Sequence, residues 1–120
     1  MTRVLLVEDN AVYRSTLELL LPAEGLEIVG AVEDGESAVE AAISARPDVV
    51  LLDLRLPGLS GAEAVAAILE RAPDLAVVCL TAELEPDLGY AARAAGAIDV
   101  LDKAQPTRTI ADAIRSAAAP

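Results

Sequence analysis

Short apolar runs alternate with helix-forming segments along the whole chain, and this alternation repeats five times. Three of the runs are short and continuous: residues 4–7 (VLLV), 49–52 (VVLL) and 76–80 (AVVCL). Continuous apolar runs of this length are typical of strands whose two faces are both covered, as in a parallel sheet. Two weaker, mixed runs at residues 27–32 and 98–102 are predicted to be edge strands.

The segments between these runs carry signals for the ends of helices. Asn10 and Asp34 are suitable N-caps, and Ser60 followed by Glu63 has the pattern of a capping box. Helices are therefore predicted over residues 11–23, over 35–45 up to Pro47, from Ser60 to before Pro73, over 87–95 up to Gly96, and from 106 or 107 to about 118.

Five strand–helix units with short connections favour an α/β fold. We expect a flavodoxin-like (βα)5 three-layer sandwich, because right-handed crossovers place helices on both faces of an open parallel sheet. The two weak runs then form the edges, which gives the strand order 2-1-3-4-5. The length of 120 residues fits a single domain covering residues 1–120.

The composition excludes several classes of function. The net charge of −11 argues against direct contact with nucleic acid, since an acidic surface repels phosphate groups. The chain has no histidine and a single cysteine, Cys79, so it has no His-based triad, no internal disulfide and no multi-cysteine zinc site. Cys79 is predicted to be buried in its apolar run. The N-terminal MTRVLLVEDN is neither a signal peptide nor a membrane span, so a cytoplasmic protein without a membrane partner is expected.

Polar side chains follow the predicted strands at one end. Glu8 and Asp9 follow the first strand, Asp53 ends the third, Thr81 ends the fourth and Lys103 follows the fifth. Ligands of open α/β sheets bind at the carboxyl edge, where the winding reverses between strands 1 and 3. Each of these residues alone fits a cap, a turn or a solvated surface position. Their joint placement predicts a functional site at this edge.

Three neighbouring carboxylates repel one another unless a cation neutralises them. Mg²⁺ is the natural choice, because it is a hard ion that prefers oxygen ligands, with water and a backbone carbonyl completing an octahedron. Lys103 adds a point charge, and Thr81 adds a hydroxyl. An aspartate such as Asp53 can act as a nucleophile toward phosphorus, and the cations would stabilise charge on the transferring oxygens.

Four pieces of the chain together resemble the receiver domain of bacterial response regulators, the CheY-like family. They are VLLVEDN, RPDVVLLDLRLPGLSG, VVCLTA and AGAIDVLDK, and they span almost the whole length. The stretch VGAVEDGESAVEAA is most similar to regulators of the NarL/FixJ type, whose receivers usually precede a helix-turn-helix output domain.

The resemblance implies a role for each matching residue. Asp53 would be the phosphoacceptor, with Asp9 a direct ligand of Mg²⁺ and Glu8 a ligand through water. Lys103 would contact the phosphoryl group, and the hydroxyl of Thr81 would move toward it. The remaining assignments are the backbone carbonyl of Arg55 as a further metal ligand, the side chains of Arg55 and Glu83 as modulators of phosphoryl lifetime, Ala82 as a small residue that leaves the approach open, and Pro57, Gly58 and Gly61 as residues that shape the following loop and helix start.

The chain departs from the family pattern at three places. Val100 stands where Tyr or Phe is usual, so the coupling between Thr81 and an aromatic ring cannot take its usual form. Asp102 stands where an apolar residue is typical, and it either pairs with Lys103, weakens the pull of Lys103 on the phosphoryl group, or faces solvent, as strand alternation favours. Glu8 makes the acidic pair Glu-Asp rather than Asp-Asp.

The resemblance implies a phosphorelay switch. A sensor histidine kinase would supply the phosphoryl group, and the domain would catalyse its own phosphorylation and dephosphorylation without being a conventional multiple-turnover enzyme. The face of the fourth helix, fifth strand and fifth helix would then dimerise or contact an output domain, typically a transcriptional one. Whether the chain is a stand-alone regulator or part of a longer one stays open.

Three other functions are alternatives to this switch. The first is a binding module that keeps the fold without switching, which Val100 favours. The second is a phosphatase of the haloacid-dehalogenase kind, which needs an acid where Arg55 stands. The third is a flavodoxin, whose phosphate the Glu8-Asp9 pair would repel.

Overall fold

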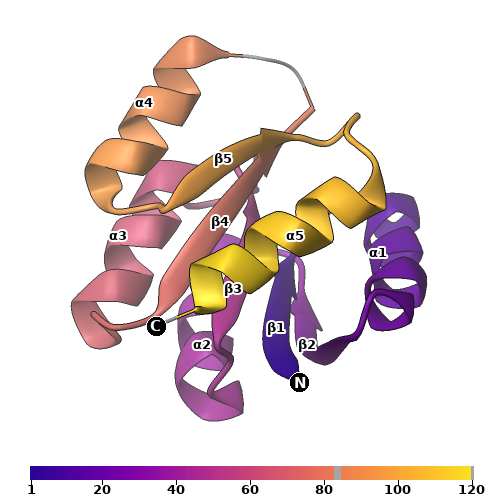
Figure 1. Cartoon of the computed structure of the whole chain (residues 1–120). Helices are drawn as coiled ribbons and strands as arrows, with labels where there is room; N and C mark the ends of the chain where they lie inside the picture. The colour runs from indigo at the N-terminus through magenta and orange to yellow at the C-terminus, as the bar shows by residue number, and fades with distance from the viewer. Residues whose placement is uncertain (83–84, 120) are drawn as a thin grey trace.

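The computed structural model describes residues 1–82 and 85–119, which contain five strands and five helices (Figure 1). The strands are β1 (Thr2–Val7), β2 (Leu26–Val32), β3 (Val49–Asp53), β4 (Ala76–Thr81) and β5 (Asp99–Asp102). The helices are α1 (Ala11–Ala23), α2 (Gly35–Ala45), α3 (Gly61–Arg71), α4 (Pro86–Ala95) and α5 (Thr107–Ala118).

The strands form one parallel sheet in the order β2-β1-β3-β4-β5, so the predicted fold and strand order are confirmed. Two clusters of buried side chains lie on opposite faces of this sheet. One packs the sheet against α2, α3 and α4, and the other packs it against α1 and α5. Figure 1 shows α5 crossing one face while α2 and α3 lie on the other.

The burial of the strands follows their place in the sheet. Every residue of β3 and β4 is buried, whereas every residue of the edge strand β5 is partly exposed. This agrees with the continuous apolar runs of the central strands. Cys79 lies fully buried in β4, and burial raises the pKa of its thiol to about 12.

The predicted caps form as the sequence indicated. The Asn10 side chain accepts a hydrogen bond from the backbone N–H of Tyr13 at 2.9 Å, and Asp34 accepts one from Ser37 at 2.7 Å. Ser60 and Glu63 make both hydrogen bonds of the capping box. Helix α4 begins at Pro86, one residue before its predicted start, because proline suits the first helical position.

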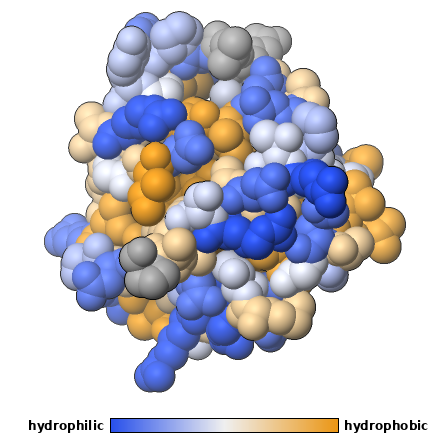
Figure 2. All heavy atoms as spheres, in the orientation of Figure 1, coloured by the Kyte–Doolittle hydropathy of each residue, from blue (hydrophilic) through white to orange (hydrophobic). Residues whose placement is uncertain are grey.

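On the face seen in Figure 2, hydrophilic residues cover most of the surface and smaller hydrophobic areas lie between them. Among residues 1–82 and 85–119, no helix has both the length and the apolar character needed to cross a membrane.

Candidate functional site

The sheet register brings the acidic residues together. Strands β1 and β3 are parallel neighbours with Val7 opposite Leu52, so the residues that follow each partner lie side by side. Those residues are Glu8 and Asp53, and both are buried, with 2% and 5% of their surface exposed. Asp9 continues from Glu8 and is exposed. The site therefore combines two buried carboxylates with one that is open to solvent.

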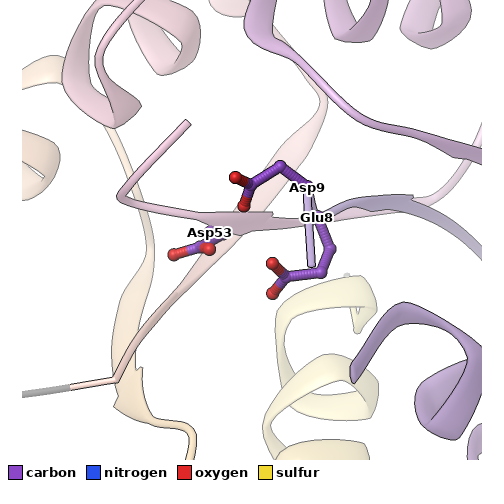
Figure 3. A group of neighbouring side chains, drawn as sticks. All are labelled: Glu8, Asp9 and Asp53. Carbon is purple, nitrogen blue, oxygen red and sulfur yellow. The ribbon is translucent and has the colours of Figure 1, made fainter. Parts of the chain in front are cut away.

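The three carboxylates converge as expected. One oxygen from each of Glu8, Asp9 and Asp53 lies within 4.8 Å of the other two. Figure 3 shows the three side chains reaching toward the same space from the ends of β1 and β3. This spacing suits three ligands of one cation, and it would be unfavourable for three charges without one.

Lys103 lies against this acidic group. Its Nζ is 3.0 Å from Oδ2 of Asp53 and 2.5 Å from Oε1 of Glu8, and its side chain is 15% exposed. Its backbone N–H donates to the carbonyl of Thr81 at 2.8 Å, which ties the segment after β5 to the end of β4. In the absence of a metal, the ammonium group supplies the positive charge between the two buried carboxylates.

Lys103 and Glu8 influence each other's ionisation. Burial alone would lower the pKa of Lys103, but its close contacts with the carboxylates of Glu8 and Asp53 outweigh burial, so the pKa is raised. Burial raises the pKa of Glu8, and the contact with Lys103 opposes that shift without cancelling it. An added cation near Glu8 would therefore favour its ionised form.

Backbone and side-chain donors fix the orientation of the carboxylates. Oε2 of Glu8 accepts from the backbone N–H of Asn10 at 3.0 Å, and the Glu8 carbonyl accepts from the Arg14 guanidinium at 2.8 Å. Oδ1 of Asp53 accepts from the backbone N–H of Arg55 at 3.0 Å. Each buried carboxylate is thus held on one oxygen while its other oxygen faces Lys103.

The donor set fits a hard divalent cation. The ligand atoms that Glu8, Asp9 and Asp53 offer are carboxylate oxygens, which Mg²⁺ prefers. Oε1 of Glu8 is buried and accepts no well-directed hydrogen bond from the described residues, although it makes the ion pair with Lys103. A buried oxygen of this kind has a lone pair available for a metal-bound water. The Arg55 carbonyl stays a predicted ligand, while the Arg55 side chain forms an ion pair with Glu85.

The other predicted residues lie on the side of β4 and β5. Thr81 is buried at the end of β4, and Ala82 beside it is exposed. Thr81 and the half-buried Val100 line a groove of about 310 Å³ that also contacts Tyr90 of α4. Glu83 lies outside the described residues. Asp102 accepts a hydrogen bond from the backbone N–H of Ala104 at 2.8 Å, so its carboxylate caps the turn before Gln105.

Close packing shapes the loop after Asp53. A Cβ atom on Gly61 would lie 2.6 Å from Cα of Leu54, and the Gly61 N–H donates to the Leu54 carbonyl at 3.1 Å. Gly58 has a φ of 79°, a conformation that favours glycine. Pro57 lies in the same exposed loop. The missing side chain at Gly61 therefore allows the start of α3 to lie against Leu54, the residue that follows Asp53.

Two residues at the site were not predicted from the sequence. The ring of Tyr13 lies under the Lys103 ammonium, with 4.6 Å between Nζ and the ring centroid. Arg14 pairs with Glu33 at 3.0 Å as well as with the Glu8 carbonyl. Their position in the first turn of the helix after the acidic pair was the available signal, since the first turn faces the end of β1.

Comparison with known proteins gives consistent matches. The profile of the family described as "Response regulator receiver domain" matches residues 4–115. The chain is 37% identical over 118 residues to the transcriptional regulatory protein LiaR of Bacillus subtilis, covering 98% of this chain and 56% of that protein. It is 40% identical over 116 residues to protein-glutamate methylesterase/protein-glutamine glutaminase 3 of Myxococcus xanthus, covering 94% of this chain and 32% of that protein.

The signal receiver domain of the response regulator NarL from Mycobacterium tuberculosis has the same fold. The TM-score is 0.92 at 32% identity, over 98% of this chain and 95% of that one. The expected similarity to NarL-type receivers is thus confirmed. The chain spans about a third to just over half the length of the two curated relatives named above. From the family profile, these identities and the shared fold, we conclude that the chain belongs to the response regulator receiver domain family.

Proposed function

We propose that residues 1–120 form one receiver domain of a two-component phosphorelay, which accepts a phosphoryl group on Asp53 from a sensor histidine kinase. The observation that carries this proposal is the placement of the Asp53 carboxylate. It lies at the end of a central strand, 3.0 Å from the Lys103 ammonium and within 4.8 Å of carboxylate oxygens of Glu8 and Asp9.

The chemistry follows from how Asp53 is held. A carboxylate oxygen attacks phosphorus, the P–O bond to Asp53 forms, and the P–N bond to the kinase histidine breaks. Lys103 stays beside the oxygens that carry the charge of the transferring group. Asp9, Asp53, the Arg55 carbonyl and, through water, Glu8 would hold Mg²⁺. When bound, this ion supplies charge neutralisation at the phosphoryl oxygens. Water later hydrolyses the acyl phosphate and resets the domain.

The response begins at the ends of β4 and β5. A phosphoryl group adds a charge of about −1.5 to −2, and the Thr81 hydroxyl would move toward it. Because the Lys103 N–H is bonded to the Thr81 carbonyl, the two strand ends respond together. The face of α4, β5 and α5 would then bind a second copy or an output domain, in keeping with the transcriptional regulators among the relatives. Such a domain acts in the cytoplasm.

Val100 favours one alternative, a receiver-like binding module that keeps the fold without switching. With valine in place of an aromatic side chain, the groove beside Thr81 has no ring on β5 to rotate into it. Amide hydrogen exchange with and without Mg²⁺ and beryllofluoride, a phosphoryl analogue, separates the two functions. Slower exchange around Thr81 and along α4 supports the switch, and a change confined to the acidic residues supports the static module.

Intact mass after incubation with a small phosphodonor and Mg²⁺ tests the phosphorylation site. We expect one phosphoryl group on the wild-type chain and none on Asp53→Asn. Asp112→Asn is a matched control, because Asp112 lies on α5 and pairs with Arg115. Full labelling of Asp53→Asn would rule out the site, and a wild-type chain that takes up no phosphoryl group would rule out the function.

A further inference from the structure

Tyr13 lies where α1 meets the acidic site. Its backbone N–H donates to the Asn10 side chain at 2.9 Å, which fixes the first turn of the helix. Its half-buried ring packs on the hydrophobic cluster between the sheet and α1 and α5. The position of this ring is therefore set by the fold and does not depend on a ligand.

The Lys103 ammonium rests on this ring, with 4.6 Å between Nζ and the centroid. A cation within about 6 Å of an aromatic centroid is attracted by the electron-rich face, and the attraction grows as the cation is desolvated. Lys103 meets that condition, because only 15% of its side chain is exposed. The ring is thus a third partner of the ammonium, beside Glu8 and Asp53.

The ring differs from the other two partners in one respect. Glu8 and Asp53 belong to the group of oxygens that suits a metal ion, so their attraction for Lys103 weakens when a cation shares them. The ring carries no charge and is not a metal ligand. It continues to attract the ammonium under conditions in which the carboxylates are engaged elsewhere.

The hydroxyl of Tyr13 does not explain this placement. It is buried, and no residue in the described part of the chain forms a hydrogen bond with it. A buried hydroxyl without a partner costs free energy, so the polar end of the side chain contributes little that is favourable here. The favourable contact of Tyr13 with Lys103 is therefore made by the face of the ring.

We propose that Tyr13 is a positioning residue that holds the Lys103 ammonium over its ring, within reach of the phosphoryl group on Asp53, when the acidic residues bind a cation. This inference rests on the proposed function, since it assigns a role in the same phosphoryl transfer. It also has a part that is independent of activity, which is the location of the Lys103 side chain.

Rates of labelling by a small phosphodonor with Mg²⁺ test the role in transfer. Tyr13→Phe keeps the ring and should stay within about twofold of wild type, whereas Tyr13→Leu keeps an apolar side chain and should be about two- to thirty-fold slower. If Tyr13→Leu does not fold, Tyr13→Met provides the same comparison. A ring-free variant that folds and is labelled at the wild-type rate would overturn the inference while leaving the proposed function standing.

Nuclear magnetic resonance tests the position of Lys103 directly. Protons on Cε of Lys103 should be shifted upfield by the ring in wild type and in Tyr13→Phe, both without metal and with Mg²⁺ and beryllofluoride. The upfield shift should disappear in the ring-free variant. Protons without an upfield shift in the wild type with Mg²⁺ and beryllofluoride would overturn the inference. A wild-type chain that takes up no phosphoryl group would instead overturn the proposed function.

Discussion

Replacing Lys103 with methionine should destabilise the metal-free protein strongly. Methionine keeps the length and apolar stem of the side chain but removes the charge, which leaves Glu8 and Asp53 facing each other with 2% and 5% of their surface exposed. Removing one partner from a buried ion pair costs about 3–5 kcal/mol. With an m-value of about 1.5 kcal/mol per molar urea, the midpoint of unfolding should fall by about 2–3 M.

Urea unfolding followed by circular dichroism, with EDTA or with Mg²⁺, measures this effect. Mg²⁺ should stabilise Lys103→Met more than wild type, because the variant has lost the positive charge that otherwise neutralises the carboxylates. Arg108→Met is the matched control. Its side chain is 81% exposed and lies 3.8 Å from Glu24, so its loss should cost no more than about 1 kcal/mol.

The dependence on pH has a definite sign. The pKa of Glu8 is raised above 4.5 in the folded chain, so the folded state binds more protons and stability falls as pH rises through the window above 4.5. Loss of Lys103 enlarges this effect, and Lys103→Met should regain stability as pH falls from 7 toward 5. The raised pKa of Lys103 contributes stability to the wild type that is lost only above pH 10.5. Equal urea midpoints for wild type and Lys103→Met in EDTA would refute the claim that the Lys103 charge stabilises the buried carboxylates.

Three further perturbations test other parts of the structure. Gly61→Ala should lower stability by about 1–3 kcal/mol and slow labelling of Asp53, because its Cβ would lie 2.6 Å from Cα of Leu54. Gly89→Ala is the control, since its Cβ would lie at an ordinary 3.8 Å from Val100, and thermal unfolding compares the two variants. Cys79 should not react with a disulfide reagent at pH 8 until urea unfolds the chain, since burial raises the pKa of its thiol to about 12. Fast reaction without urea would contradict the burial of Cys79. Ser60→Ala should raise the lowered pKa of Glu63 only part of the way back toward 4.5, because the backbone N–H of residue 60 still donates to Glu63 and only the hydroxyl is lost. A titration followed by nuclear magnetic resonance measures this pKa, and an unchanged value would contradict the prediction.

The arrangement of the sheet could be predicted because each strand carried its own signal. Residues 49–52 and 76–80 are continuous apolar runs, and both became fully buried central strands. The weaker runs became β2 and β5 at the edges. The convergence of Glu8 and Asp53 followed in turn, since the carboxyl ends of neighbouring parallel strands lie at one edge.

The contacts around Lys103 could not be predicted in the same way. They depend on how α1 packs beside the segment after β5, which brings Tyr13 within 4.6 Å of an ammonium ninety residues later in the chain. Sequence periodicity reports which face of a helix is buried and carries no information on such partners. Capping residues gave the bounds of α1 and α2 correctly, whereas the starts of β5 at Asp99 and of α4 at Pro86 each differ by one residue from the prediction.

The contact of Lys103 with both buried carboxylates has a consequence for how the pocket fills. Lys103 already neutralises Glu8 and Asp53, so we expect the proposed divalent ion to displace its ammonium group from these carboxylates, which lowers the apparent affinity for the ion. The displaced ammonium cannot diffuse away, because its own backbone is anchored to the end of β4. In the proposed function, binding of the metal would therefore also make the Lys103 ammonium available to an incoming anion.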